Sequence, residues 1–433
     1  MSLLPRTALR TLHLLAAACC TIGVASAGVL VVDDQGGPGV DFTNLPSAVA
    51  AAADGDVLLV KDGAYGGFTV AGKSLVVVAE VQAGVLIHGR IEVQGLGPAQ
   101  SVVLRGLKTG QPAEEGLLVS GCQGPVWVED CILAGAIGDN DLVPPVGSID
   151  AYPGALVVDS AAVSFARCDL TGGHGPGVVN EQTQSFPGDG GDGVRSEDST
   201  VTLYDCILTG GPGGSVFDST PDWGGNGGSG LRMLGGFAFA SRTEFIGQDG
   251  GDGGADLFAC GNGGEGGNGV SLSSGSPQVE LLDGTFQTGT GGVGGPVCPN
   301  GGDGMPIDVF TGTATQLPGA GRKLRVATPV REQETVDLIF RGQPGDAVFA
   351  LVSASQGSAW LPAFLGTLLL GNFQPVPMGT IPPTEVLIAP LTIGFLSPGV
   401  EAATVYLQMG VLDAGGAPLL GGNSAVVILD ETF

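Results

Sequence analysis

Two arginines at equivalent places in a repeated segment are the strongest candidates for chemistry in this sequence. Arg195 and Arg232 each follow a glycine by two residues, at the start of a predicted strand. Asp192, Glu197 and Asp198 lie near Arg195 and are expected to line up beside the pair. Guanidinium groups bind carboxylates through paired hydrogen bonds. The pattern indicates either a solvated row of ion pairs or a binding subsite for an anionic sugar.

A second set of residues could bind calcium. Asp-Gly-Gly-Asp occurs in two glycine-rich segments and Gly-Gly-Asp-Gly in a third. The candidate ligands are Asp189, Asp192, Asp249, Asp252 and Asp303. Carboxylate oxygens on stacked loops suit Ca²⁺, but the nonapeptide of calcium-binding β-rolls is incomplete, because Arg195 and Pro306 stand where it requires Asp. Structural calcium and acidic loops that keep the protein soluble both stay open.

The cysteines predict an export context rather than a zinc site. Cys260 and Cys298 lie one repeat apart inside glycine-rich segments, where an oxidising compartment favours a disulfide. Three more occupy equivalent repeat positions and are expected to stack inward as buried thiols: Cys131, Cys168 and Cys206. Cys122 has no assigned partner. No Cys/His set has the spacing of a zinc site.

An internal repeat positions these residues. The segment that runs from Val126 to Cys131 recurs from Val163 to Cys168 and from Val201 to Cys206, with two degenerate copies that start at Phe237 and Val279. A second marker, the glycine that opens the next strand, keeps the same spacing at Gly116, Gly154, Gly193, Gly230, Gly269 and Gly304. Repeats that keep one period bury their apolar faces by stacking, so the sequence predicts a solenoid.

The segment before the repeats identifies a family resemblance. Residues 41–56 predict a short helix, with Asn44 as its N-cap and Pro46 in its first turn. Strands are expected at 57–70 and 73–80. This stretch and the Val-x-Φ-x-x-Cys-x-Leu repeats (Φ, apolar) resemble the pectate-lyase-like, right-handed parallel β-helix superfamily of secreted bacterial proteins. The resemblance covers residues 29–316 and implies an all-β solenoid of about eight coils under a short capping helix.

The whole chain divides into five predicted segments. Arg6 and Arg10, an apolar run and Ala25-Ser26-Ala27 are typical of a secretory signal peptide; an anchor helix or a lipoprotein signal at Cys19 are the alternatives. About seven short strands near the C-terminus favour a β-sandwich. The segments are a signal peptide (1–27), a solenoid cap (28–56), a parallel β-helix with glycine-rich stacked loops (57–316), a linker (317–321) and a C-terminal β-sandwich (322–433).

Charge and hydropathy limit the partners. The formal net charge is −27, and loss of Arg6 and Arg10 with the signal peptide makes it more negative. Such a chain repels nucleic acid. No stretch after the leader reaches the roughly 20 apolar residues of a membrane span. We therefore expect a secreted or cell-surface protein, monomeric, without nucleic-acid partners. Its 79 glycines concentrate in segments that are either flexible linkers or an ordered stacked layer.

The resemblance implies polysaccharide enzymes as well as non-catalytic surface proteins. Polygalacturonase-like enzymes combine Gly-His-Gly with paired Asp residues and Arg-x-Lys, and this chain has only the first element, at His174. The Arg-x-Pro-x-x-Arg pattern of pectate-lyase-like enzymes is absent. The favoured hypothesis is non-catalytic binding or scaffolding of extracellular polysaccharide or cell-envelope matrix, with no cofactor or with calcium. The alternative is a polysaccharide lyase or glycoside hydrolase that acts on acidic glycans through Arg195, Arg232 or His174.

Overall fold

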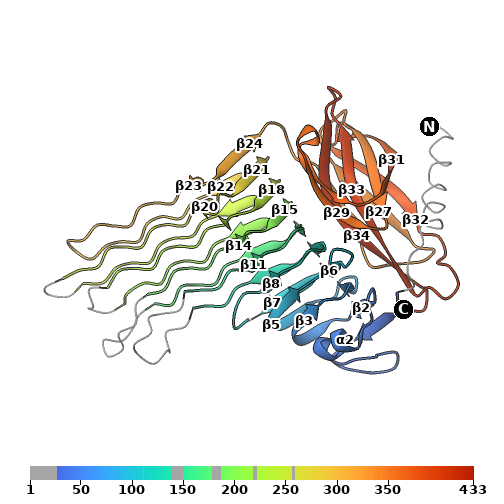
Figure 1. The fold of residues 1–433 in the computed structure, drawn as a ribbon, viewed down its shortest axis with the longest axis horizontal. Coiled ribbons are helices and arrows are strands. Elements are labelled where there is room, and N and C mark those ends of the chain that lie inside the picture. Colours follow the sequence, from blue (N-terminus) through green and yellow to red (C-terminus); the bar gives the residue numbers. More distant parts are fainter. Residues whose placement is uncertain (1–26, 111, 139–149, 178–186, 218–221, 256–258) are drawn as a thin grey trace.

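The computed structural model describes a strand-rich chain with two large parallel sheets and a C-terminal group of smaller sheets (Figure 1). The described residues are 27–110, 112–138, 150–177, 187–217, 222–255 and 259–433. The predicted signal peptide therefore lies, except for Ala27, outside the described residues. Within these ranges no helix is long and apolar enough to span a membrane.

One short helix lies near the N-terminal end of the folded part of the chain, after a first strand at Val29–Val32, as predicted. Helix α2 (Leu45–Ala51) starts after Asn44, whose side-chain oxygen accepts a hydrogen bond from the Ser47 backbone N–H at 2.9 Å. Pro46 occupies its first turn, where a missing N–H costs nothing. Leu45, Ala48 and Val49 are buried against the first strands. The helix thus covers the N-terminal end of the apolar core.

The first parallel sheet brings equivalent residues of successive repeats side by side. Val163 pairs with Val126 on one side and with Val201 on the other, which is the register that the repeat predicts. The sheet has ten strands. In spatial order they are β1 (Val29–Val32), β2 (Val57–Val60), β4 (Leu75–Ala79), β6 (Val102–Arg105), β9 (Val126–Glu129), β12 (Val163–Ala166), β15 (Thr200–Tyr204), β18 (Phe237–Ser241), β21 (Gln278–Leu282) and β24 (Thr313–Leu317).

The second parallel sheet has fourteen strands and divides into two branches. Strand β3 (Gly63–Ala71) pairs with the ten-residue strand β5 (Val85–Gln94), whose first half pairs with one branch and whose second half pairs with the other. The first branch contains β7 (Leu107–Gly110), β10 (Ile132–Ala134), β13 (Asp169–Thr171), β16 (Ile207–Thr209), β19 (Glu244–Ile246) and β22 (Thr285–Gln287). The second contains β8 (Leu117–Ser120), β11 (Ala155–Val158), β14 (Val194–Glu197), β17 (Leu231–Leu234), β20 (Val270–Ser274) and β23 (Ile307–Val309).

The two parallel sheets share an apolar core that includes the repeated cysteines. Cys131, Cys168 and Cys206 are buried free thiols, and Cys122 is also buried and free. Burial raises the pKa of the Cys131 and Cys206 thiols well above its ordinary value. The Cys131 and Cys206 thiols therefore stay protonated, and the buried cysteines pack as small apolar groups.

The glycine-rich segments leave the sheets between the two branches and run outward and back (Figure 1). Their backbones are hydrogen-bonded to one another. Gly191 donates its N–H to the Gly173 carbonyl, and Gly211 donates to the Gly191 carbonyl, so the bonds alternate between outgoing and returning segments. Gly228 continues the series by donating to Gly211. In their described parts these segments form an ordered layer, which we call the glycine layer.

The glycine layer has a period of three residues. Gly172 and Gly175 donate to the next outgoing segment, whereas Gly173 between them donates to a returning segment. Three residues per turn without internal hydrogen bonds is the geometry of a polyproline II helix. Two residues of each triplet therefore face neighbouring backbones, and the third residue faces outward.

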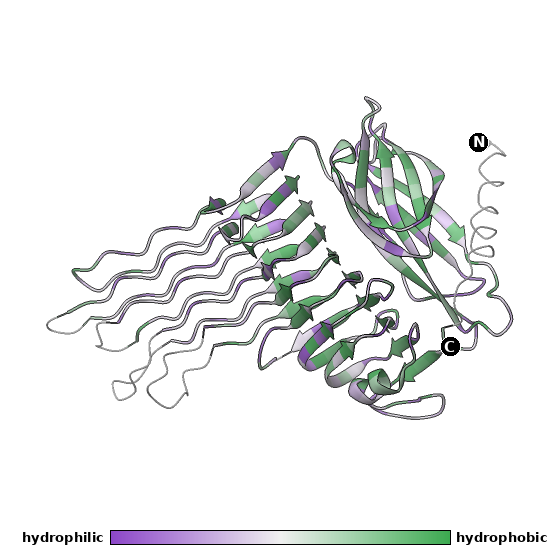
Figure 2. Ribbon diagram, viewed as in Figure 1, coloured by the Kyte–Doolittle hydropathy of each residue, from purple (hydrophilic) through white to green (hydrophobic). Residues whose placement is uncertain are grey.

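Close backbone contact explains why glycine fills the two inward positions. A Cβ atom on Gly211 would lie 1.7 Å from the Gly173 carbonyl oxygen, and one on Gly228 would lie 1.9 Å from the Gly191 oxygen. Neither distance is possible for a real side chain. Hydropathy agrees, because apolar residues gather on the strands while the glycine layer is mostly pale or hydrophilic (Figure 2).

Residues 322–433 form three further sheets, in which antiparallel pairs predominate. A separate apolar core joins the three-stranded and five-stranded sheets. The three-stranded sheet contains β25 (Lys323–Arg325), β27 (Thr335–Arg341) and β32 (Val386–Thr392). The five-stranded sheet contains β26 (Val330–Arg331), β34 (Pro418–Leu429), β33 (Ala402–Leu412), β28 (Ala347–Ser353) and β31 (Phe373–Thr380). The third sheet is a two-stranded antiparallel hairpin of β29 (Gln356–Leu361) and β30 (Gly366–Leu370).

The ten strands in this region exceed the seven expected. Strand β31 escaped the sequence pattern because Pro375 and Pro377 resemble turn signals, yet the strand lies at the edge of its sheet, where missing N–H groups are tolerated. Strand β29 has no buried residue, so it lacks the apolar alternation that predicts a strand.

The C-terminal region packs on the outer face of the ten-stranded sheet (Figure 1). The Trp127 and Tyr406 rings meet edge to face with centroids 5.2 Å apart, and Trp360 contacts Phe239 at 5.0 Å. The Tyr204 hydroxyl donates to the Thr367 carbonyl at 3.2 Å. Several repeats and several C-terminal strands therefore share one interface.

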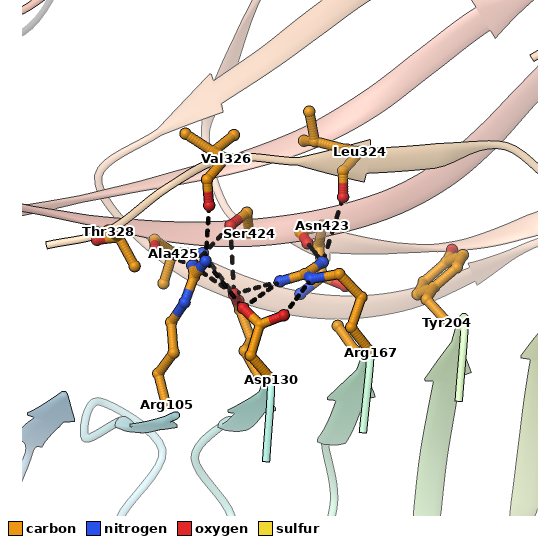
Figure 3. Close-up of polar contacts among 12 residues, drawn as sticks. Arg105, Asp130, Arg167, Tyr204, Leu324, Val326, Thr328, Asn423, Ser424 and Ala425 are labelled. Atoms are coloured by element: carbon orange, nitrogen blue, oxygen red, sulfur yellow. Dashed lines mark hydrogen bonds and ion pairs between the residues drawn. The ribbon is translucent and has the colours of Figure 1, made fainter. Parts of the chain in front are cut away.

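A buried ionic network, drawn in Figure 3, is the polar centre of this interface. The Glu129 carboxylate, which has no exposed surface, lies 2.9 Å from both Arg105 and Arg167. It also accepts the Ala425 backbone N–H at 2.8 Å. Arg105 donates to the Val326 and Ala425 carbonyls, and Arg167 donates to Asn423. Three charges from successive repeats therefore hold the C-terminal backbone.

The substitution Glu129→Gln tests the network. The change leaves Arg105 and Arg167 with Asp130 as their shared carboxylate, so one buried positive charge loses its compensation and we expect the unfolding free energy to fall by about 3 kcal/mol. Urea denaturation followed by fluorescence measures the change. Glu431→Gln, on an exposed residue, is the matched control and should leave stability unchanged. Equal midpoints for the two variants would contradict this role for Glu129.

A second pair of substitutions tests the glycine layer. Gly211→Ala should lower stability by about 2 kcal/mol through overpacking, since the added methyl group meets a backbone oxygen. Gly302→Ala is the control in the same layer, because no atom lies within 4 Å of the added Cβ. Thermal unfolding of both variants measures the difference. A Gly211→Ala protein as stable as Gly302→Ala would refute the close packing.

Candidate functional site

The two predicted arginines lie next to each other on the outer face of the fourteen-stranded sheet. Arg195 in β14 pairs in register with Arg232 in β17. Their side chains are 42% and 44% exposed, respectively. Their neighbours along the strands, such as Val194 and Leu231, are buried, so alternation directs both guanidinium groups outward.

Two of the predicted acids accompany the arginines. Glu197 Oε1 lies 2.8 Å from Arg195 Nε, and Asp192 Oδ2 lies 3.7 Å from Arg232 Nη1. Burial raises the pKa of the Asp192 carboxyl, while the Arg232 and Arg195 charges act in the opposite direction. Arg232 Nε is buried and has no hydrogen-bond partner among the described residues. The site thus holds cations with an unused donor.

The other two predicted residues are not joined to this pair. Asp198 follows β14 in a left-handed turn with φ of 45°, and it makes no ion pair within the described ranges. His174 is an exposed residue of the glycine layer, and its carbonyl accepts the Gly138 N–H. In the described part of the chain, no hydrogen bond links the His174 side chain to Arg195 or Arg232.

Register extends the arginine pair into a longer row that sequence reasoning did not identify. The positions at its two ends are acidic, two leucines precede the arginines, and a serine follows them. The outer row comprises Glu92, Leu118, Leu156, Arg195, Arg232, Ser271 and Asp308. At about 4.8 Å per strand it is roughly 29 Å long. Alignment of the strand positions across all repeats would have found it.

A second charged cluster lies at the start of the row. Arg90 Nη1 contacts the Glu114 carboxylate and lies 2.9 Å from Glu115 Oε1. Arg90 Nη2 lies 3.5 Å from Glu92 Oε2. Burial lowers the pKa of Arg90, but the three carboxylates raise it by more, so the pKa lies above its ordinary value. This cation is more strongly neutralised than Arg195 or Arg232.

The predicted calcium ligands have another structural role. Asp252 Oδ1 accepts the Val293 backbone N–H at 2.7 Å, and Asp192 Oδ1 accepts the Ser229 N–H at 2.9 Å. Similar bonds of 2.7–3.0 Å are formed by the remaining candidates, Asp189 to Asn226, Asp249 to Thr290 and Asp303 to Gly291. Each carboxylate therefore satisfies an N–H in the glycine layer.

At equivalent positions, asparagine side chains also accept backbone N–H groups. Asn226 Oδ1 accepts the Glu265 N–H at 2.9 Å, and Asn268 Oδ1 accepts the Met305 N–H at 2.7 Å. In the described ranges no group of three or more His, Cys, Asp or Glu side chains is arranged to hold a metal ion. Calcium binding stays a prediction. Because both Asp and Asn accept these backbone N–H groups, the hydrogen bonds require an oxygen acceptor but no negative charge.

Cys260 and Cys298 form a disulfide between the last two glycine-rich segments. Their Cα atoms lie 5.9 Å apart and are 38 residues apart in sequence, which is one repeat. The Ala255–Cys260 bridge lies beside it. The disulfide therefore ties one outgoing and returning pair to the next.

Comparison with known proteins assigns no family to the chain. No protein-family model matches it, and no curated protein matches it. Among solved structures, it is similar to ORF18 of Geobacillus virus E2, with 10% identity, a TM-score of 0.21, and coverage of 98% of this chain and 90% of that one.

Substitutions at Asp252 separate the hydrogen-bond role from calcium binding. Asp252→Asn keeps an oxygen acceptor for Val293 and should retain wild-type stability, whereas Asp252→Ala should lose about 1 kcal/mol. Thermal unfolding in calcium and in EGTA measures both. If the carboxylate instead binds calcium, Asn and Ala will be equally destabilised, and EGTA will lower the wild-type midpoint.

Proposed function

We propose that this chain is a secreted or cell-surface, monomeric protein that binds or scaffolds extracellular polysaccharide or cell-envelope matrix without catalysis. The proposal includes a right-handed parallel β-helix of the pectate-lyase-like type, a signal peptide before Gly28 and a C-terminal β-sandwich. Its support is the way each repeat contributes strands to two parallel sheets in turn, with equivalent residues in register.

The outer row carries the proposal of polysaccharide binding. Its positions repeat at the strand spacing over roughly 29 Å, and all of them except the buried Ser271 are partly exposed. This length suits an extended polymer better than a small molecule. Arg195 and Arg232 are partly exposed at the centre of the row, where their forked donors suit the carboxylates of an acidic glycan. Leu118 and Leu156 precede them in register and offer apolar surface to the faces of sugar rings.

The electrostatics favour binding over catalysis. A general base must be able to lose its proton near the working pH. Arg195 and Arg232 present guanidinium groups, which donate hydrogen bonds and accept none, and acids lie within 3.7 Å of both. His174 lies in the glycine layer, and among the described residues no hydrogen bond joins its imidazole to either arginine. These groups therefore suit recognition of an anion.

Binding measurements with the double variant Arg195→Ala/Arg232→Ala test this function. Each lost charged hydrogen bond is worth about 1.5–3 kcal/mol, so affinity for a uronate polysaccharide should fall at least tenfold. Affinity electrophoresis and calorimetry measure the loss. Lys108→Ala, an exposed cation in β7, is the control and should bind as the wild type does.

Activity measurements on the same proteins distinguish the enzymatic alternative. The wild type should release no reducing ends from uronate or neutral polysaccharides, with or without calcium. Release that disappears in the double variant would replace the binding proposal with a lyase or hydrolase. Unchanged retention of every polysaccharide by the folded double variant would remove the outer row as the binding site.

A further inference from the structure

A cavity of about 300 Å³ gathers four cations in a chain that has few of them. It is lined by Arg242, Lys323, Arg325, Ile339 and Arg341. The whole sequence contains 16 Lys and Arg residues against 43 acids. A concentration of positive charge is therefore unexpected in this cavity, and these cations need a compensating negative charge.

Strand pairing places three of these cations on one surface. Lys323 in β25 lies directly opposite Arg341 in β27, and Arg325 lies opposite Ile339. Residues two apart in a strand share a face, so Lys323, Arg325 and Arg341 are neighbours. Like charges directly opposite each other destabilise a sheet. The arrangement is unfavourable for the sheet unless an anion lies between the side chains.

The fourth cation comes from the parallel part of the chain. Arg242 follows β18 in a left-handed turn with φ of 53°. It is one of a series of corner residues with this conformation, which includes Asp130, Arg167 and Asp205. Packing of the C-terminal region against this corner thus completes the cavity from two distant parts of the sequence.

Nearby carboxylates balance only part of this charge. Asp205 Oδ1 lies 2.9 Å from Arg242 Nε and 3.3 Å from Lys323 Nζ, and Asp283 lies 3.8 Å from Arg242. Arg341 is exposed and has no ion pair in the described part of the chain. These acids pair with Arg242 and Lys323, whereas the other two cations, Arg325 and Arg341, form no ion pair in the described part of the chain.

Arg325 does not find its counter-charge in the buried network. Its charge acts on Asp130, but that carboxylate already lies 2.8 Å from Arg167 and 2.9 Å from Arg105. Arg325 itself is exposed and forms no ion pair within 4 Å among the described residues. Its guanidinium group is therefore available to a ligand in the cavity, as is that of Arg341.

We propose that this cavity binds a doubly charged tetrahedral oxyanion, either a phosphoryl group on a larger molecule or free phosphate or sulfate. Two uncompensated arginines match the charge of a phosphate monoester above its second pKa of about 6. Their forked donors match its oxygens. The volume is at the lower end of ligand pockets, which are about 300–1,000 Å³, and it admits the anion with one small attached group. This site lies apart from the outer row and does not depend on the proposed function.

Calorimetry at pH 8 and low salt, on the protein without its signal peptide, tests the proposal with inorganic phosphate, inorganic sulfate, a hexose 6-phosphate and the neutral hexose. The charged probes should bind and the neutral hexose should not. Arg325→Gln/Arg341→Gln should weaken phosphate binding at least tenfold. Tighter binding of the hexose phosphate would identify a phosphoryl-bearing ligand, and equal or weaker binding would identify the free anion.

Two further variants of the protein serve as controls. Arg341→Gln alone changes an exposed side chain and should weaken binding even if the double variant does not fold. Arg195→Ala/Arg232→Ala should bind phosphate as the wild type does, so failure of polysaccharide binding and failure of this site are distinguishable. The proposal is overturned if the folded wild type binds none of the charged probes at millimolar concentration, or if Arg341→Gln binds phosphate with unchanged affinity.

Discussion

In the two parallel sheets, each repeat of this chain satisfies its backbone hydrogen bonds on the repeats beside it, and the rest of the structure depends on this. In the sheets the partners are in parallel register, as at Val126, Val163 and Val201. In the glycine layer, bonds within a repeat alternate with bonds between repeats: Gly191 donates to Gly173 of its own repeat, and Gly211 donates to Gly191 of the preceding repeat. A change in length within one repeat would therefore displace donors and acceptors in the repeats on both sides.

The same register aligns equivalent residues of successive repeats in rows along the sheets. Arg195 and Arg232 are useful as a pair only because β14 and β17 are aligned. On the ten-stranded sheet, Glu129 and Arg167 from successive repeats form an ion pair at the interface with the C-terminal region. Buried ionic groups contribute little net stability compared with well-packed apolar residues, but loss of one partner is costly. Their effect here is to fix where the C-terminal backbone lies along the ten-stranded sheet.

The repeat marker predicted the strand register and the buried cysteines, and Asn44 predicted the start of α2, because these features depend on local pattern. Sequence alone did not reveal strand β31, whose prolines are acceptable only at an edge. It also did not reveal that Asp252 accepts a backbone N–H, since that requires the neighbouring segment in place. The cavity at Arg341 was hidden for a similar reason, because Arg242 reaches it only through tertiary packing.

The lack of side chains inside the glycine layer has a thermodynamic consequence. An apolar core loses part of its driving force on cooling, because burial of apolar surface carries a large heat-capacity change. Burial of peptide groups changes the heat capacity in the opposite direction. Contacts such as Gly228 to Gly211 bury backbone almost alone. The layer should therefore keep its share of the folding free energy in the cold, where the cores between the sheets weaken.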